Sequence, residues 1–275
     1  MKKVLLVFDG SHFSEGAFEF ARRINEMQPV LVAGIFLPQV DYANLWSYAD
    51  GSASPLFIPL VEAEYSDAVA DNIERFQKQC ENNSMEYRVH KDFFDFAIPG
   101  LKRESRFADL IILGSETFYE NFGKRELNEY LKVALHESEC PVLVVPEKFD
   151  FPESNIIAFD DSASSVYALK QFSYLFPTLC TNKTLLVYVK EEEDEAFPDE
   201  ANITELAARH FSDLTLFKLE TNPRKYFANW LNDKKSAILI TGAFGRSAIS
   251  QLFRKSFVSK VISEHKLPVF IAHRE

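Results

Sequence analysis

Glycine and cysteine are scarce in this chain. Of its 275 residues, nine are glycine and three are cysteine, and the cysteines (Cys80, Cys140 and Cys180) stand far apart with no Cys-x-x-Cys pair. This excludes a disulfide framework and a cysteine-based zinc site. Because glycine is rare, a pair of glycines at a short fixed spacing carries more information than usual.

Long apolar runs are also missing near the start. After Met1-Lys2-Lys3 only Val4–Phe8 are apolar before Asp9 interrupts them, which is too short for a secretory signal or a membrane span. We therefore expect a cytoplasmic protein with no membrane association, and we interpret this run as a first β-strand.

Several catalytic and metal-binding patterns are absent as well. The sequence contains no Gly-x-Ser-x-Gly and no Walker loop, and its six histidines show no His-x-x-x-His spacing. These absences argue against a hydrolase, a P-loop nucleotidase and a metal centre. We expect no catalytic residues and no metal ligands, and hence a protein that is not an enzyme.

Charge and apolar content bound the class of protein. The chain has 30 Lys+Arg and 41 Asp+Glu, giving a net charge of −11, and it is 47% hydrophobic with 26 Phe. The acidic balance argues against nucleic-acid binding. The apolar content is ample for buried cores.

The sequence repeats itself. Val4-Leu-Leu-Val-Phe-Asp9-Gly-Ser11 resembles Ile156-Ile-Ala-Phe-Asp160-Asp-Ser162, and each is followed by an amphipathic helix, over Ser14–Met27 and Ser164–Leu175. Likewise Ala108–Gly114 matches Ser236–Gly242, and Cys140–Pro146 matches Leu267–His273. The constant order indicates a duplicated domain, with residues 1–148 as the first copy and 149–275 as the second.

Each copy alternates short β-branched runs with helical patterns, which is typical of a doubly wound parallel sheet. Strands are expected near residues 3–8, 30–36, 86–91, 109–114 and 142–146, and again near 155–159, 183–190, 213–219, 236–241 and 268–272. The fold class is thus α/β, as two tandem Rossmann-like five-stranded sheets. Ligands of such sheets bind at the carboxyl ends of the strands where the strand order reverses, which draws attention to Asp9 and Gly114, and to Asp160 and Gly242.

A phosphate-binding pattern occurs in the second copy. Its fourth strand runs into Gly242-Ala-Phe-Gly245, then nine residues, then Lys255-Ser256 before a helix that ends near Glu264. Glycines allow close backbone approach to an anion, and helix-start amides bind phosphate oxygens. The alternative is that both are ordinary turn glycines.

These motifs resemble those of the universal stress protein family, and the resemblance covers both halves as a tandem member. It implies an adenine-nucleotide-alpha-hydrolase-like fold and adenine-nucleotide binding without catalysis. The implied nucleotide-contacting positions are Ala158, Asp160, Val189, Gly242, Gly245, Ser256 and Phe257. ATP, with Mg²⁺ accompanying it, is the implied ligand, although Lys255 replaces the family glycine before the serine.

The first copy departs further from the family. Gly114 is followed by Ser115-Glu116-Thr117 with no second glycine, and Glu116, Glu120, Glu126 and Glu129 would face a phosphate. Residues 224–274 hold ten Lys/Arg and two Asp/Glu, a balance of 10 − 2 = +8, whereas residues 102–147 hold six and nine, a balance of 6 − 9 = −3. We expect ATP in the second copy only.

Three further interpretations remain. The acidic run Glu191–Glu195 is either a solvated loop or a Mg²⁺ ligand set. The aromatic segment Leu37–Leu60 has no counterpart in the second copy, so an alternative function is a nucleotide-free module that binds another small ligand or a protein partner there. An ATP pyrophosphatase or adenylyl-transferase is the least supported alternative, because neither first-strand loop is rich in glycine and serine.

The fifth strand of each copy, Val142–Val145 and Val269–Ala272, is apolar. The resemblance places it at a sheet edge, and an exposed apolar edge needs a partner. We predict that the two fifth strands pair and make the chain an intramolecular pseudo-dimer, with a homodimer of the whole chain as a further possibility.

Overall fold

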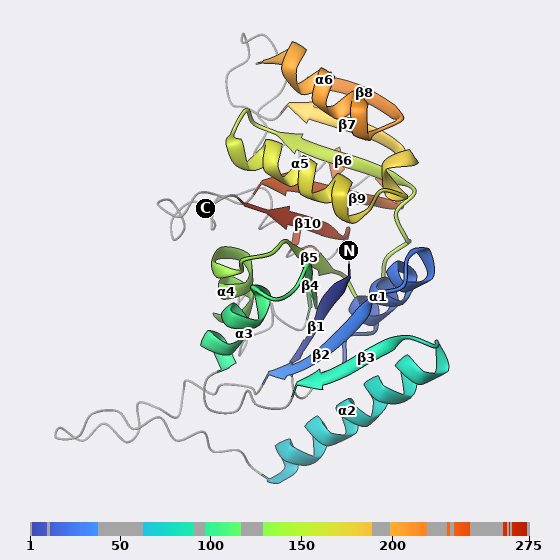
Figure 1. Ribbon diagram of the computed structural model, residues 1–275, viewed down its shortest axis with the longest axis vertical. Coiled ribbons are helices and arrows are strands. Elements are labelled where there is room, and N and C mark those ends of the chain that lie inside the picture. The colour runs from blue at the N-terminus through green and yellow to red at the C-terminus, as the bar shows by residue number, and fades with distance from the viewer. Residues whose placement is uncertain are drawn as a thin grey trace, which may run out of the picture.

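The computed structural model describes residues 2–9, 12–37, 63–90, 97–116, 129–188, 199–218, 230–231, 234–242, 261–262, 264 and 266–273. Over these residues the chain is an α/β protein with one continuous ten-stranded sheet and helices on both faces (Figure 1). All ten predicted strands are present, with ends within two residues of the expected positions. The predicted fold class is confirmed.

The first half contains β1 (Lys3–Asp9), α1 (Glu15–Met27), β2 (Leu31–Leu37), α2 (Ala63–Asn82), β3 (Glu86–His90), α3 (Ala97–Ser105), β4 (Leu110–Gly114), α4 (Glu129–Glu137) and β5 (Val142–Val145). The second half contains β6 (Ser154–Phe159), α5 (Ala163–Leu175), the 3-10 turn η2 (Leu179–Thr181), β7 (Lys183–Tyr188), α6 (Glu200–His210), β8 (Asp213–Lys218), β9 (Ala237–Gly242) and β10 (Val269–Ala272). The two halves therefore repeat one succession of strands.

The strand order is β3-β2-β1-β4-β5-β10-β9-β6-β7-β8. Within each half all pairings are parallel, and the first strand of the half lies between its second and its fourth. The order therefore reverses between β1 and β4, and between β6 and β9. These are the two switch points at which ligands of open α/β sheets bind.

The two halves join through their fifth strands. β5 and β10 pair antiparallel, with Val144 opposite Val269, Leu143 opposite Phe270 and Val142 opposite Ile271. The predicted pairing of the two fifth strands is thus present, and it converts two five-stranded sheets into one. Among the described strands, only the two outermost, β3 and β8, have one side without a partner strand.

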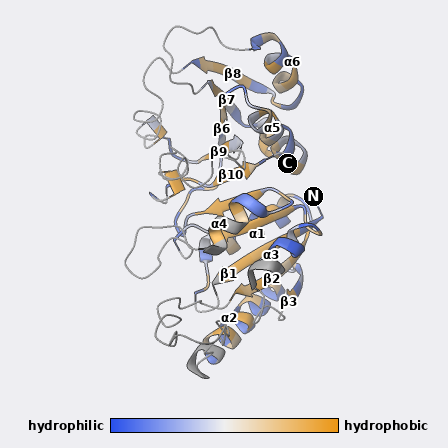
Figure 2. Cartoon of the chain, turned by 90° about the vertical axis from the view of Figure 1, so that its left-hand side faces the viewer, coloured by the Kyte–Doolittle hydropathy of each residue, from blue (hydrophilic) through white to orange (hydrophobic). Residues whose placement is uncertain are grey.

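Alternation along the strands sorts the apolar residues into two cores. Val4, Leu6 and Phe8 of β1 face the core that is covered by α1, α2, α5 and α6, whereas Leu5 and Val7 face the one covered by α3 and α4. This period-2 pattern is what a sheet with two covered faces requires. Figure 2 shows the strands as predominantly hydrophobic between helices of mixed character.

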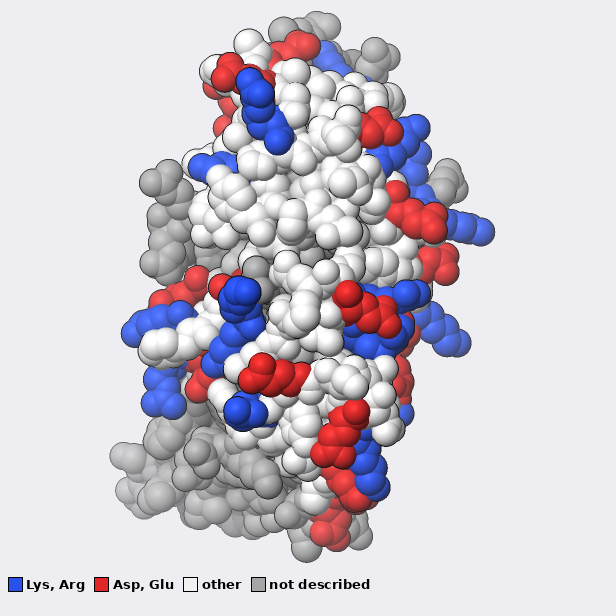
Figure 3. Space-filling view, turned by 45° about the vertical axis from the view of Figure 1, so that its right-hand side comes forward, with Lys and Arg blue, Asp and Glu red and all other residues white. Residues whose placement is uncertain are grey.

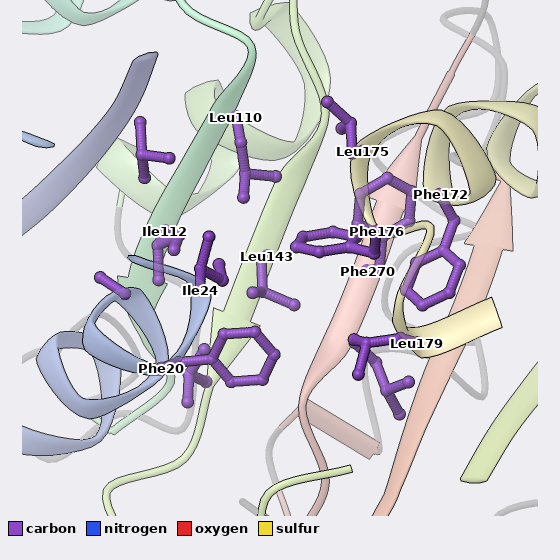
Figure 4. Packing of buried hydrophobic residues seen from close by; sticks show 14 of the residues in the cluster. Phe20, Ile24, Leu110, Ile112, Leu143, Phe172, Leu175, Phe176, Leu179 and Phe270 are labelled. Atoms are coloured by element: carbon purple, nitrogen blue, oxygen red, sulfur yellow. The ribbon is translucent and has the colours of Figure 1, made fainter. Parts of the chain in front are cut away.

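The core on the α1 side is continuous across the junction of the halves. The Phe270 ring of β10 packs edge-to-face against Phe172 and Phe176, with centroid distances of 5.4 Å and 5.9 Å. Figure 4 shows these rings beside Leu143 of β5 and Phe20 of α1. Described residues of both halves thus belong to one apolar cluster on this face.

Phenylalanine also dominates the outer part of the first half. Phe8 stacks on Phe36 and on Phe13, with centroids 5.0 Å and 4.6 Å apart, and Phe76 of α2 meets Phe8 edge-to-face at 5.9 Å. Gly34 of β2 makes room for this packing, because a Cβ there would lie 2.8 Å from the Phe76 ring. Much of the phenylalanine content therefore serves packing.

The connection between the halves is itself packed. Residues 146–153 link β5 to β6, and the rings of Phe149 and Phe151 lie 5.6 Å and 5.1 Å from that of Phe20 on α1. The guanidinium of Arg23 lies over Phe151 at 5.5 Å. At the start of β6, the Ser236 carbonyl accepts hydrogen bonds from the Glu153 and Ser154 amides. The connection is thus held at both ends.

Candidate functional site: two strand-end edges

The two switch points lie on opposite sides of the sheet, at the ends of its strands rather than at its outer strands. Strands within each half are parallel, but β5 and β10 run antiparallel, so the carboxyl ends of the first-half strands lie at the edge where the second-half strands begin. We call these the first edge, after β1 and β4, and the second edge, after β6 and β9. A ligand at one edge cannot contact the other.

At the second edge, Asp160 is held by its own turn. Its Oδ1 accepts a hydrogen bond from the Ser162 amide at 3.0 Å, and Asp161 between them has a left-handed backbone with φ of 64°. Ser162 then caps α5, because its Oγ accepts from the Ser165 amide at 3.1 Å. The exposed Asp160 carboxylate is thereby fixed beside the start of α5.

Gly242 lies against the same helix start. A Cβ at Gly242 would come within 2.5 Å of the Ser164 carbonyl carbon and the Ser165 amide nitrogen. The glycine is therefore required for close contact between β9 and α5, whatever ligand binds. The structure thus brings Asp160, Gly242 and the α5 N-terminus together, as the sequence predicted for the first two.

Ala158 lies deeper at the same edge. It is 5% exposed, and its neighbours across the sheet are Val187 of β7 and Thr241 of β9. Its side chain belongs to the core on the α3 and α4 side of the sheet. The side chain at this position of the second edge is thus small and uncharged.

The remaining predicted site residues lie outside the described part of the chain. These are Val189, Gly245, Ser256 and Phe257, together with Lys255, the acidic run Glu191–Glu195 and all of the Leu37–Leu60 segment except Leu37. β7 ends at Tyr188 and β9 at Gly242. Their assignments stay predictions.

The first edge is occupied by two carboxylates of the chain itself. After Gly114, Glu116 Oε2 accepts hydrogen bonds from the Ser115 hydroxyl at 2.8 Å and from the Glu147 amide at 3.0 Å. The Glu147 carboxylate in turn accepts from the Gly16 amide at 3.1 Å, at the start of α1. The partial positive charge of that helix end therefore already has an anion beside it.

Close backbone contact accompanies this arrangement. A Cβ at Gly16 would overlap the Pro146 carbonyl oxygen and lie 2.8 Å from the Glu147 Cα. Ser115 is buried, and its amide donates to the Val145 carbonyl at 2.8 Å. The chain leaving β5 therefore lies directly on the first turn of α1.

The comparisons with known proteins concern the fold. No protein-family model matches the sequence, and no curated protein matches it either. Among solved structures, a universal stress protein from Archaeoglobus fulgidus DSM 4304 superimposes with a TM-score of 0.71 at 16% identity, covering 99% of this chain and 96% of that one. The chain has the universal stress protein fold.

The match extends over both halves, since nearly all of each chain is covered. A protein of unknown function from Pseudomonas aeruginosa PAO1 is also similar, with a TM-score of 0.58, 11% identity, and coverage of 99% of this chain and 92% of that one. The resemblance inferred from the repeated motifs therefore holds at the level of the fold.

Within the described ranges, no three His, Cys, Asp or Glu side chains lie close enough together to hold a metal ion. No helix in that part of the chain combines the length and the apolar composition needed to cross a membrane.

Burial is the main cause of a shifted pKa in four of the described side chains. It raises the pKa of Cys80, Cys140 and Cys180 to about 12 each, so these thiols are poor nucleophiles at neutral pH. Burial and the nearby His273 lower the pKa of His136. His136 belongs to α4 of the first half and His273 follows β10 of the second, so this effect acts across the junction.

Sequence reasoning missed the role of Glu147, which it included in the first copy without giving it a contact. The contact with Gly16 spans 131 positions, and no local pattern predicts it. One signal was available: the repeat aligns Pro146 with His273, so Glu147 matches Arg274. The two copies of the universal stress protein fold thus differ in charge at this position.

Proposed function

We propose that the protein is a cytoplasmic, non-enzymatic universal stress protein of the tandem type that binds one adenine nucleotide per chain, at the second edge. The fold supports the family assignment. The observation that carries the choice of edge is the Glu147 carboxylate bound to the Gly16 amide at the start of α1, at a position that the repeat matches with the basic Arg274 in the second copy.

The first edge disfavours a phosphate. Glu116 and Glu147 already use the amides of Glu147 and Gly16 as donors, and an incoming phosphate would meet two carboxylates. Like charges in a partly desolvated site are strongly unfavourable. ATP with Mg²⁺ would have to displace these hydrogen bonds before it gained any of its own.

The second edge differs in that, among its described residues, no carboxylate is bound to a first-turn amide of α5, although the exposed Asp160 and Asp161 precede the helix. Asp160 is its one described carboxylate whose position is fixed by the turn that starts α5, and it suits a ribose hydroxyl as an acceptor. Ala158 and Gly242 add no charge beside it. The basic segment 224–274, with a balance of +8, adds an attraction for phosphate.

Catalysis is not part of the proposal. The Ser115 hydroxyl donates to the Glu116 carboxylate at the first edge, but Ser115 is buried and is not presented to a substrate, and the Ser162 hydroxyl at the second edge caps α5. Any hydrolysis of bound nucleotide is expected to be slow. The protein would then act by binding, with the nucleotide as a reporter of the state of the cell.

Equilibrium dialysis with ATP and Mg²⁺ tests the stoichiometry. We expect one nucleotide per chain. Asp160→Ala should weaken binding about 10–100-fold because a charged hydrogen bond is worth about 1.5–3 kcal/mol. Asp160→Asn keeps an oxygen that can accept from the Ser162 amide, so it separates the loss of the charge from the loss of the turn. Gly245→Trp should abolish binding.

The control variant is Glu116→Gln, which changes the first edge only and should leave the affinity unchanged. Two nucleotides per chain, or wild-type affinity in Gly245→Trp, would overturn the choice of edge. Mass spectrometry of ligand released from the purified protein gives an independent readout. Recovery of a hydrophobic metabolite and no nucleotide would favour the nucleotide-free binding module instead.

A further inference from the structure

Helices α1 and α5 occupy equivalent positions in the two halves but have different outer faces. Both have 13 residues and begin after a capping serine, Ser14 or Ser162, so residue n of α1 corresponds to residue n + 148 of α5. This correspondence allows their solvent-facing positions to be compared one by one.

The outer face of α1 is charged and covered with ion pairs. Arg22 pairs with Glu19 at 2.7 Å and with Glu26, and Arg23 pairs with Glu19 at 3.2 Å. Glu15 pairs with Arg75 of α2. Such a surface is typical of a helix that faces solvent.

The outer face of α5 has lost almost all of this charge. The five positions that correspond to Glu15, Glu19, Arg22, Arg23 and Glu26 are Ala163, Tyr167, Lys170, Gln171 and Tyr174. Residues 162–182 contain one charged residue, Lys170, in a chain that is 26% charged. The upper half of Figure 3, formed by the second half of the chain, shows a broad area without Lys, Arg, Asp or Glu.

This face also carries exposed aromatic surface. Tyr174 is 56% exposed, one of three large hydrophobic side chains that stand out in this way among the described residues. Its ring packs edge-to-face against the His210 ring of α6, with centroids 5.5 Å apart. Tyr167 and Val166 are half-buried. Tyrosine on a rigid helix is a side chain that protein interfaces favour.

We propose that the outer face of α5 is a homodimerisation surface that binds the same face of a second copy of the chain, with the two α5 helices antiparallel. A two-fold axis between Lys170 and Gln171 would place Tyr167 of one copy against Tyr174 of the other. Lys170 of one copy would then face Gln171 of the other rather than a second lysine. The face is self-complementary about that point.

Charge favours a second copy as the occupant. Each chain carries −11, so two copies repel one another over acidic surfaces, but the α5 face presents no acidic residue between Ser162 and Asn182. In the antiparallel arrangement the exposed Asp160 and Asp161, before α5, approach the opposite end of the partner helix, where Lys183 is exposed. Because Lys183 is paired in register with the exposed Asp213, this end of the partner is balanced in charge rather than acidic.

The dimer is expected to be weak. One pair of helices buries less than the roughly 1,200 Å² found in stable interfaces, so a dissociation constant in the micromolar range is expected. The interface centres on α5 and reaches the second edge only at Asp160 and Asp161, and dimerisation does not require a bound nucleotide.

Sedimentation equilibrium of the full chain over about 1–300 µM tests the proposal. The wild type should pass from monomer to dimer over this range. The triple variant Tyr167→Glu, Gln171→Arg, Tyr174→Glu, which copies the charges of α1, should remain monomeric. Glu26→Gln on α1 is the matched control and should dimerise like the wild type. Circular dichroism checks that each variant is folded.

A charge-swap experiment tests the register. Tyr174→Glu and Tyr167→Lys should each dimerise poorly alone, but an equimolar mixture should form a heterodimer, because position 174 of one chain faces position 167 of the other. A wild type that is monomeric throughout would overturn the proposal. Dimerisation of the triple variant would also overturn it, as would a mixture no more associated than its components.

Discussion

The carboxylate of Glu147 accepts a hydrogen bond from the backbone amide of Gly16, 131 positions earlier in the chain, at 3.1 Å. It supplies a negative charge to the first turn of α1 and fixes the chain as it leaves β5. One side chain thus caps a helix and anchors the connection between the two halves.

Replacement of Glu147 should therefore destabilise the protein. Glu147→Ala removes both the acceptor and the charge, and a loss of about 1 kcal/mol in the free energy of unfolding is expected, the usual value for a helix N-cap. Glu147→Gln keeps an acceptor and should cost less. Urea denaturation measures both. Equal losses in the two variants would mean that the hydrogen bond contributes nothing beyond the charge.

Gly16 and Gly242 should not tolerate a methyl group. In Gly16→Ala the new Cβ would overlap the Pro146 carbonyl oxygen, and in Gly242→Ala it would lie 2.5 Å from the α5 backbone. Each should lower the free energy of unfolding by about 1–3 kcal/mol, because backbone must move. Ser164→Ala, at the position of α5 that matches Gly16, is the control, and thermal unfolding that ranked it equal to Gly16→Ala would contradict this explanation.

The two halves should unfold together. Leu143 of the first half and Phe270 of the second lie opposite each other in the sheet and belong to one core on the α1 side, so neither half buries this surface alone. We expect one calorimetric transition, and Phe270→Ala should lower its midpoint through a loss of about 3–5 kcal/mol. Two resolved transitions in the wild type would show that the halves are independent.

The three thiols should be unreactive in the native state. Each is buried and has a pKa raised to about 12, so little thiolate is present at pH 8. Ellman's reagent should label none of them within minutes in buffer and all three in guanidinium chloride. Rapid native labelling of even one thiol would place it at the surface.

Stability should decrease on acidification through His136. Burial, and then the nearby His273, hold the pKa of folded His136 below its ordinary value of 6.5. As the pH falls below 6.5, the unfolded chain takes up a proton that the folded chain does not, so unfolding becomes easier. Denaturation midpoints between pH 7.5 and 5 should fall less in His136→Gln than in the wild type. His210→Gln is the control for histidines elsewhere.

The fold was largely predictable from the sequence because its signals are local. Buried strands such as Val4–Phe8 and Ile156–Phe159 are short apolar runs bounded by polar residues, and the repeat identified the second set once the first was found. The pairing of β5 with β10 followed from the need of two apolar edge strands for partners.

The candidate site was predictable only in part. Asp160 and Gly242 were found because strand ends can be located from the sequence, and the sheet topology then brings them together. The reason for Gly242, contact with the α5 backbone, depends on how closely a helix packs on a strand, and no spacing encodes that distance. The contacts that the carboxylates of Glu116 and Glu147 make join segments 31 and 131 positions apart, respectively, and could not be predicted from the sequence either.

The antiparallel junction of β5 and β10 has an evolutionary consequence. Where two identical chains associate through this strand, every substitution appears twice, so a helix face or a strand end cannot change in one subunit alone. Covalent linkage of the two halves removes that constraint. Glu147 could arise beside α1 while the matching residue became Arg274, and α5 could exchange charge for tyrosine while α1 kept its ion pairs. Duplication within one chain thus allowed the two copies to specialise separately.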